Sequence, residues 1–282
     1  MNKQQAQETL LEINLKPKKS LGQNFLIDPR VVNKIITTAN LNKDDIILEV
    51  GTGLGALTTE LSLRVKKVYS YEIDYKLFQY ISKKVSSISN IEFIHGDILK
   101  SELPNHNKIV SNIPYTITGP LFEKVFYNEH PPEGTLIIEK SIADRIFNPE
   151  DYKKFSRISV SFNAFMNPVK KLKISSKSFY PSPRIELSLI KVKKKENIHP
   201  FLLEKKNKTF FLNFVAGIMP YKNKNMINAL ELFLKNKTEG PITRINLLIF
   251  LKDHNISNLK LFKFKTDELV EICVNLFSWL NI

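Results

Sequence analysis

Between residues 44 and 192, short apolar runs alternate with segments in which apolar residues recur every three or four positions. Runs of roughly 4–8 apolar residues are typical of buried strands, whereas the wider spacing is typical of amphipathic helices. Leu57, Leu61 and Val65 show this helical spacing after the first run. The alternation predicts an α/β domain with a mostly parallel sheet. The predicted strands are 46–50, 67–71, 91–95, 108–111, 135–139 and 186–192.

The alternation stops near the charged segment 191–196, which we interpret as a linker. Three helices are predicted beyond it, over residues 202–218, 224–234 and 267–280. We therefore expect an α/β domain over residues 1–196 and a small α-helical domain over residues 197–282.

Three glycines and two carboxylates follow the predicted strands. Gly51, Gly53 and Gly55 stand at alternate positions between a strand and a helix, where glycine permits a tight turn and a close approach to a ligand. Glu72 ends the next strand and can accept hydrogen bonds from ribose hydroxyls. Asp97 ends the third strand and can accept one from an adenine amine, although a turn or helix cap is the alternative. The pattern predicts a cofactor that contains a nucleoside.

Two cofactors fit the glycine motif. Gly51, Gly53 and Ala56 match the G-x-G-x-x-A fingerprint of dinucleotide binding. Counted from Glu49, the same stretch reads E-x-G-x-G-x-G, as in S-adenosylmethionine sites. An acidic Glu49 suits the amine and sulfonium of S-adenosylmethionine better than a pyrophosphate. The motif alone leaves the cofactor open, and a glycine-rich turn that binds nothing is the third interpretation.

Composition narrows the choice of partners. The chain has 42 Lys+Arg against 28 Asp+Glu, a net charge of +14, which favours a polyanionic partner, although a Lys-rich surface without a partner is the alternative. Cys273, the single cysteine, excludes an intramolecular disulfide and a multi-cysteine metal site, and no two of the five His have metal-ligand spacing. The first nine residues lack a signal-peptide core, and the most apolar stretch, 210–220, is too short to span a bilayer. We expect a cytoplasmic protein without a metal.

The fourth strand ends in the sequence Asn112-Ile113-Pro114-Tyr115. The Asn112 side-chain oxygen and the Ile113 carbonyl, held by rigid Pro114, can accept the two N–H bonds of an aromatic amine. Tyr115 can stack on a base turned out of its helix. A proline turn after a buried strand is the alternative.

With this loop, the chain resembles the ribosomal RNA adenine-N6 dimethyltransferases. Further motifs that carry the resemblance, in the family's order, are Gly22-Gln-Asn24-Phe-Leu26, Gly51–Gly55, Glu72-Ile-Asp74, Gly96-Asp97 and Phe179-Tyr-Pro181-Ser-Pro183. The resemblance covers residues 18 to about 195. It implies a Rossmann-like S-adenosylmethionine-dependent methyltransferase domain over residues 1–196, followed by a helical RNA-binding domain over residues 197–282.

The resemblance favours the housekeeping branch of this family. Those enzymes dimethylate two adjacent adenines in the 3′-terminal hairpin of small-subunit (16S-type) rRNA and contribute to ribosome biogenesis. We therefore expect a monomer that acts on the small ribosomal subunit, away from membranes. Alternatives are a large-subunit rRNA methyltransferase of the macrolide-resistance type and a ribosome assembly factor without catalysis. A nicotinamide-dependent oxidoreductase rests on the glycine fingerprint alone.

The resemblance also implies roles for single residues. The cofactor would contact Asn24, Leu26, Glu49, Gly51, Gly53, Gly55, Glu72, Asp97 and Asn112. Within this set, Glu72 faces the ribose and Asp97 the adenine, while Asn24 and Leu26 close over the cofactor. The catalytic set is Asn112, Pro114, Tyr115 and Phe179. Tyr115 and Phe179 would sandwich the target adenine.

Basic residues cluster on both sides of these motifs. Residues 152–184 contain eight Lys or Arg and no Asp or Glu, and residues 16–19 form a second cluster. A solvated Lys-rich face is the alternative to an RNA surface. The stretch 219–230 corresponds to an arginine-rich segment of the family and has no Arg. The predicted RNA contacts are Lys18, Lys19, Lys153, Lys154, Arg157, Lys170, Lys171, Lys173, Arg184, Lys222 and Lys224.

Overall fold

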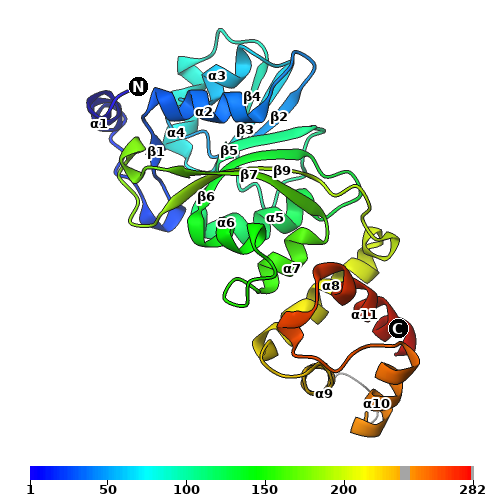
Figure 1. Ribbon diagram of the computed structural model, residues 1–282. Helices are drawn as coiled ribbons and strands as arrows, with labels where there is room; N and C mark the ends of the chain where they lie inside the picture. The colour runs from blue at the N-terminus through cyan, green and yellow to red at the C-terminus, as the bar shows by residue number, and fades with distance from the viewer. Residues whose placement is uncertain (236–241, 281–282) are drawn as a thin grey trace. The chain divides into compact units, whose positions relative to one another are not determined.

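The computed structural model describes residues 1–235 and 242–280. The chain divides into two compact units, one of residues 1–143 and 167–194 and the other of residues 144–166 and 195–282. The first is an α/β unit and the second is helical (Figure 1).

A seven-stranded sheet forms the centre of the first unit, with strand order β4-β3-β2-β5-β6-β9-β7. Neighbouring strands from β4 to β6 run parallel, and β9 is antiparallel to β6. The mostly parallel sheet and all six predicted strands are confirmed. Their bounds are β2 Ile46–Val50, β3 Lys67–Glu72, β4 Ile91–His95, β5 Lys108–Asn112, β6 Glu133–Glu139 and β9 Leu187–Lys194.

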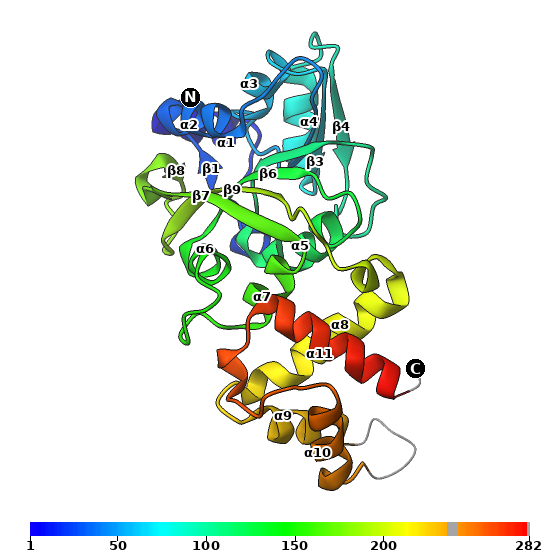
Figure 2. The same ribbon diagram turned by 45° about the vertical axis from the view of Figure 1, so that its right-hand side comes forward.

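Helices cover both faces of this sheet (Figures 1 and 2). Helices α2 (Pro29–Ala39) and α3 (Thr58–Ser62) bury Ile35 and Leu61 against Ile47 and other sheet residues. On the opposite side lie α5 (Thr118–Phe126) and α6 (Lys140–Phe147). Helix α4 (Tyr75–Lys84) begins directly after β3 and buries Leu77 and Ile81. With both faces covered, ligands have access to the sheet at its carboxyl edge.

Several short or polar elements of this unit escaped the sequence pattern. Strand β7 (Met166–Ile174) lies at the edge of the sheet and alternates exposed Lys with a few apolar residues. Lysines on an edge strand hinder pairing with other chains, and they leave no apolar run to detect. Strands β1 (Phe25–Leu26) and β8 (Phe179–Tyr180) pair with each other antiparallel. The remaining element is α1 (Lys3–Glu12), which buries Ala6 and Leu10.

Within its described residues, the second unit is built mainly from helices joined by turns and loops. Their bounds are α7 Arg157–Asn163, α8 Lys205–Ile218, α9 Met226–Leu234, α10 Arg244–Asp253 and α11 Thr266–Trp279. The three predicted helices are confirmed with shifted ends, since residues Pro200–Leu203 form a separate 3₁₀ turn. Helix α10 went unpredicted because its apolar residues point both inward, as at Phe250, and outward, as at Ile249.

The chain passes from the first unit to the second for the last time between residues 194 and 195, close to the boundary that the sequence predicts after residue 196. The structure differs at residues 144–166, which belong to the second unit. The physical reason is packing: α7 contacts α8 and α11 and buries Val160 and Phe162.

Candidate functional site

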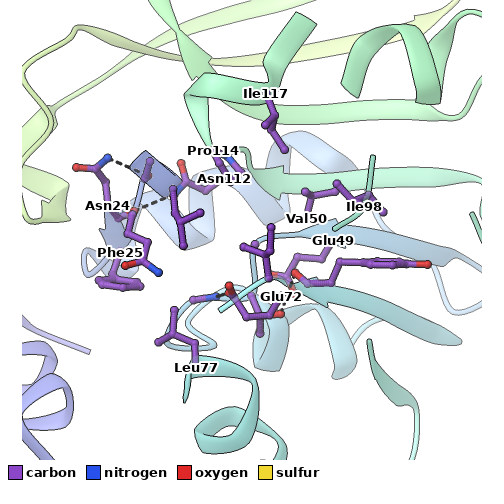
Figure 3. Close-up of a pocket in the computed structure, with 18 of the residues that line it drawn as sticks. Asn24, Phe25, Glu49, Val50, Glu72, Leu77, Ile98, Asn112, Pro114 and Ile117 are labelled. Carbon is purple, nitrogen blue, oxygen red and sulfur yellow. Dashed lines mark hydrogen bonds between the residues drawn. The ribbon is translucent and has the colours of Figure 1, made fainter. Parts of the chain in front are cut away.

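A cavity opens at the carboxyl ends of β2, β3 and β5 (Figure 3). It has a volume of about 1120 Å³, including the solvent at its mouth. The sheet edge brings together residues that are far apart in the sequence, as expected where parallel strands end. The predicted residues that line it are Asn24, Leu26, Glu49, Gly51, Gly53, Glu72, Asp97, Asn112 and Pro114.

The three glycines of the motif have left-handed backbone conformations, with φ of 80°, 57° and 79° at Gly51, Gly53 and Gly55. Side chains are disfavoured there, so the turn depends on glycine. Gly55 lies outside the cavity lining. A Cβ at Gly55 would lie 2.2 Å from Cδ1 of Ile81, so this glycine lets the turn pack on α4. Gly55 thus supports the turn that lines the cavity without lining it itself.

Glu72 is held by main-chain donors. Its Oε2 accepts a hydrogen bond from the Gly53 N–H at 2.9 Å, and its Oε1 accepts one from the Asp74 N–H at 2.9 Å. Burial raises the pKa of Glu72 above its ordinary value, while these two donors act in the opposite direction. Each carboxylate oxygen has a further lone pair. The carboxylate is thus oriented and still able to accept a hydrogen bond from a ligand.

Glu49 lies at the end of a chain of buried hydroxyls. Ser70 Oγ donates to Glu49 Oε2 at 2.7 Å, and Thr52 Oγ1 is 2.6 Å from Ser70 Oγ. Burial and the neighbouring Glu72 charge raise the pKa of Glu49 to about 7, against the hydrogen bond from Ser70. Glu49 lines the cavity and is therefore poised to ionise when a cation binds there.

Asn112 joins the end of β5 to the chain segment before β1. Its Nδ2 donates to the main-chain oxygen of Asn24 at 3.1 Å. Its Oδ1 lies 3.5 Å from the Tyr115 hydroxyl, the outer limit of a hydrogen bond. Pro114 lies beside Gly51, with Cδ 3.5 Å from where a Cβ would stand. The Asn112 amide is therefore fixed at the cavity wall by its nitrogen. Its oxygen has only the weak contact with the Tyr115 hydroxyl and can accept a hydrogen bond from a ligand.

The two predicted base-stacking rings are buried together. Phe179 is 2% exposed and belongs to one apolar cluster with Leu26 and the partly buried Tyr115. Neither ring is part of the cavity lining. Burial raises the pKa of Tyr115. The structure therefore packs the two rings in one apolar cluster outside the cavity lining, with Phe179 buried and Tyr115 partly buried.

Asp97 lines the cavity, and its Oδ1 accepts the Leu99 N–H at 2.9 Å. Asp97 therefore stabilises a turn, which was the alternative interpretation of this residue. Its carboxylate can still accept a further hydrogen bond from a ligand. Apolar neighbours that sequence reasoning missed complete the wall, notably Ile73 and Ile98. Each directly follows a predicted carboxylate, and this adjacency is the signal that could have found them.

Most of the predicted RNA contacts are exposed, namely Lys18, Lys19, Lys153, Arg157, Lys170, Lys171, Lys173, Arg184 and Lys224, whereas Lys154 and Lys222 are half-buried. Some of them also engage groups of the protein. Lys18 pairs with Asp74 at 2.8 Å and Lys173 with Glu186 at 3.3 Å. Lys222 Nζ donates to the Tyr152 carbonyl at 2.8 Å and lies 4.5 Å from the centre of that ring.

The residues also divide between the compact units. Lys153, Lys154, Arg157, Lys222 and Lys224 belong to the second unit, and the others belong to the first. Among the residues that the structure describes, no group of three or more His, Cys, Asp or Glu is arranged to hold a metal ion. Within the same residues, no helix has the length and apolar character needed to cross a membrane.

Known structures have the same fold. A dimethyladenosine transferase from Plasmodium falciparum superposes with a TM-score of 0.76 at 23% identity, covering 92% of this chain and 98% of that one. The 23S rRNA methyltransferase ErmE gives a TM-score of 0.60 at 25% identity, covering 92% of this chain and all of that one.

Sequence comparisons extend over most of the chain. The ribosomal RNA small subunit methyltransferase A of Caldanaerobacter subterraneus is 34% identical over 226 residues, which are 77% of this chain and 83% of the relative. A probable ribosomal RNA small subunit methyltransferase A of Methanococcus aeolicus is 33% identical over 93% of this chain and 97% of its own length. The sequence model of the ribosomal RNA adenine dimethylases matches residues 14–266. The chain therefore belongs to the ribosomal RNA adenine dimethylase family.

Proposed function

We propose that this protein acts in the cytoplasm and dimethylates the N6 amines of two adjacent adenines in the 3′-terminal hairpin of small-subunit rRNA. It is an S-adenosylmethionine-dependent rRNA adenine dimethyltransferase. Its relatives named small subunit methyltransferase A support the choice of small-subunit rRNA. The observation that carries the proposal is the Asn112 amide, held at the wall of a cavity that also contains Glu49 and Glu72.

The lining of the cavity suits S-adenosylmethionine. Glu72 is oriented for ribose hydroxyls, and Ile73 and Ile98 offer apolar surface beside Asp97 for an adenine. Glu49 offers a carboxylate to the cationic methionine end. The acidic Glu49 suits a cationic group better than a pyrophosphate, which disfavours the nicotinamide alternative. When bound, S-adenosylmethionine supplies a methyl group on a sulfonium, which is a good leaving group.

Asn112 positions the target amine. Its Nδ2 is anchored on the Asn24 carbonyl, so its Oδ1 can accept one N–H of adenine N6. The Ile113 carbonyl can accept the second N–H. Both bonds strengthen as positive charge develops on N6, so they stabilise the transition state more than the bound amine. Alignment of the amine with the methyl group supplies much of the remaining acceleration.

Tyr115 and Phe179 are proposed to stack on the target adenine. Because Phe179 is buried against Leu26, stacking requires this apolar cluster to open when RNA binds. Turning a base out of its stack costs a few kcal/mol, and aromatic stacking offsets about 1–3 kcal/mol of it.

The test is methyl transfer to ribosomal subunits. Undermethylated small subunits, large subunits and free small-subunit RNA are each incubated with the protein and methyl-labelled S-adenosylmethionine. We expect label at adenine N6 in small-subunit RNA. Label confined to large-subunit RNA would support the activity of the macrolide-resistance type, and binding without any transfer would support an assembly factor. Either result rejects the proposal.

A further inference from the structure

Residues 18–24, which we call the covering segment, lie over the cavity between the N-terminal part of the chain and β1. Ser20, Leu21, Gly22, Gln23 and Asn24 all line the cavity. The segment contains one 3₁₀ turn, Lys19–Leu21, and therefore has little secondary structure of its own to hold it. Its position depends on side-chain contacts.

Two contacts hold the covering segment to Asp74, the residue that precedes α4, and a third closes the segment on itself. Lys18 Nζ lies 2.8 Å from Asp74 Oδ2, and Gln23 Nε2 donates to the same oxygen at 3.2 Å. The Lys18 main-chain N–H donates to Gln23 Oε1 at 2.7 Å. The segment is thus closed into a small loop whose two ends share one carboxylate.

That carboxylate is itself buried, since the Asp74 side chain is 3% exposed whereas the Lys18 side chain is 57% exposed. Burial acts to raise the pKa of Asp74, but the hydrogen bonds from Lys18 and Gln23 and the Lys18 charge hold it below its ordinary value. A buried carboxylate that loses its cationic partner is destabilised. Lys18 is therefore important for keeping Asp74 charged in this position.

The contacts continue into the cofactor site. The Asp74 N–H donates to Glu72 Oε1 at 2.9 Å, and the same Asp74 side chain accepts the Lys76 N–H at the start of α4. At the other end of the covering segment, the Asn24 carbonyl accepts Asn112 Nδ2. One end of the segment is thus bonded directly to Asn112, and the other is linked to Glu72 through Asp74.

We propose that Lys18 is a positioning residue for the cofactor site, which it serves by holding the covering segment on Asp74. This revises the sequence-based assignment of Lys18 to the RNA surface. The identity of the cofactor rests on the proposed function. An RNA phosphate can take the Lys18 ammonium only in competition with Asp74, so Lys18 contributes little to RNA affinity.

The neighbouring Lys19 gives a matched comparison. It is exposed, and within the described parts of the chain it forms no ion pair. We expect Lys18→Met to raise the Kd of S-adenosylmethionine about tenfold or more in calorimetry without RNA. Its RNA affinity should keep the salt dependence of the unaltered protein. Lys19→Met should leave the cofactor Kd unchanged and lower the slope of log K against log salt by about 0.9, as for one lost phosphate contact.

Two further variants separate positioning from general stability. Lys18→Arg keeps the charge and should restore most of the cofactor affinity. Asp74→Asn should weaken cofactor binding as Lys18→Met does, and the double variant should be little worse than either single one, because both remove the same contact. Thermal unfolding of each variant checks that the fold is retained.

A cofactor Kd within twofold of the unaltered value in Lys18→Met would overturn the proposal, as would a salt dependence lowered to that of Lys19→Met. These outcomes leave the proposed function standing if the unaltered protein binds S-adenosylmethionine and methylates rRNA. Failure of the unaltered protein to bind S-adenosylmethionine would instead reject the function and this inference together.

Discussion

The cofactor cavity and the basic surface residues were both predicted from the sequence, yet they differ in how the fold holds them. In the cavity, Glu72, Glu49 and Asn112 are each oriented by hydrogen bonds of 2.7–3.1 Å. Most of the predicted RNA contacts are exposed lysines, and Lys18, Lys173 and Lys222 also bind groups of the protein. The position of a residue relative to a strand and turn predicts where its side chain lies. An excess of positive charge predicts only that the surface attracts a polyanion, without saying which lysines contact it.

This difference has an energetic consequence. A buried polar group that loses its partner costs about 1–3 kcal/mol, whereas an exposed charge contributes well under 1 kcal/mol. Single substitutions in the cavity should therefore have large and specific effects. Substitutions of exposed lysines should have small effects that depend on salt.

Asn112→Ala should have the largest effect, a loss of turnover of about 10²–10³-fold or more, because it removes the acceptor for the target N–H. Cofactor affinity should fall as well, but by less than turnover, because the Asn112 amide no longer holds the Asn24 carbonyl beside the cavity. Initial rates on undermethylated small subunits, with calorimetry of S-adenosylmethionine binding, measure both. Asn128→Ala is the control, since the Asn128 amide also donates to a main-chain carbonyl, that of Val125. Full activity in Asn112→Ala would remove this residue from the mechanism.

Glu72→Gln should raise the Kd of S-adenosylmethionine about 10–100-fold. The amide NH₂ would face either the Gly53 or the Asp74 N–H donor, and one acceptor for the ribose is lost. RNA affinity should not change. Glu92→Gln is the control, because Glu92 is an exposed carboxylate on the same sheet, paired with Lys67. Equal cofactor affinity in both variants would contradict the assigned role of Glu72.

The raised pKa of Glu49 should make the affinity for S-adenosylmethionine depend on pH. Because its pKa lies at about 7 in the cofactor-free protein, it ionises as the pH rises from 6 to 8. A cation binds better to the ionised carboxylate, so this group should tighten S-adenosylmethionine binding by up to about tenfold over that range. The stability of the cofactor-free protein should depend on pH in the opposite direction. The raised pKa of Glu49 favours the folded state at low pH, and this contribution is lost as the pH rises to about 7.

The control for this prediction is Glu49→Gln. The amine of S-adenosylmethionine titrates equally in both proteins, so the difference between their calorimetric pH profiles isolates Glu49. Parallel profiles would show that Glu49 does not ionise on binding.

Lys170→Met should have the smallest effect, a weakening of RNA binding by about two- to threefold at moderate salt, with the salt slope lowered by about 0.9. Lys222→Met should lower thermal stability instead, because Lys222 binds the Tyr152 carbonyl and ring within the second unit. Binding measured at several salt concentrations, together with thermal unfolding, separates the two. A salt slope lowered equally in both variants would contradict this division.

The sequence predicted the elements whose signals are local. Six strands were found because they are apolar runs, but β7 was not, since its exposed lysines suit a sheet edge. Helix α10 was missed because apolar residues occur on more than one of its faces. The glycine turn, Glu72 and Asn112 could be placed at the carboxyl edge of the sheet because each stands at the end of a strand or directly after it.

What could not be predicted depends on contacts between distant residues. Lys18 and Asp74 are 56 positions apart, and nothing in the basic cluster marks one lysine as paired. Phe179 is buried because the two-residue strand β8 pairs with β1, and such short strands leave no periodic pattern. The Lys18–Asp74 ion pair and the β1–β8 strand pairing can be identified only from the folded structure.

The proposed enzyme transfers two methyl groups to each of two neighbouring adenines. Mass spectrometry of nuclease fragments measures this on small subunits from cells that lack this protein, before and after incubation with the protein and S-adenosylmethionine. We expect two adjacent N6,N6-dimethyladenines near the 3′ end of the small-subunit RNA, present only after incubation. Unchanged fragments, or new methylation confined to large-subunit RNA, would contradict the proposed activity.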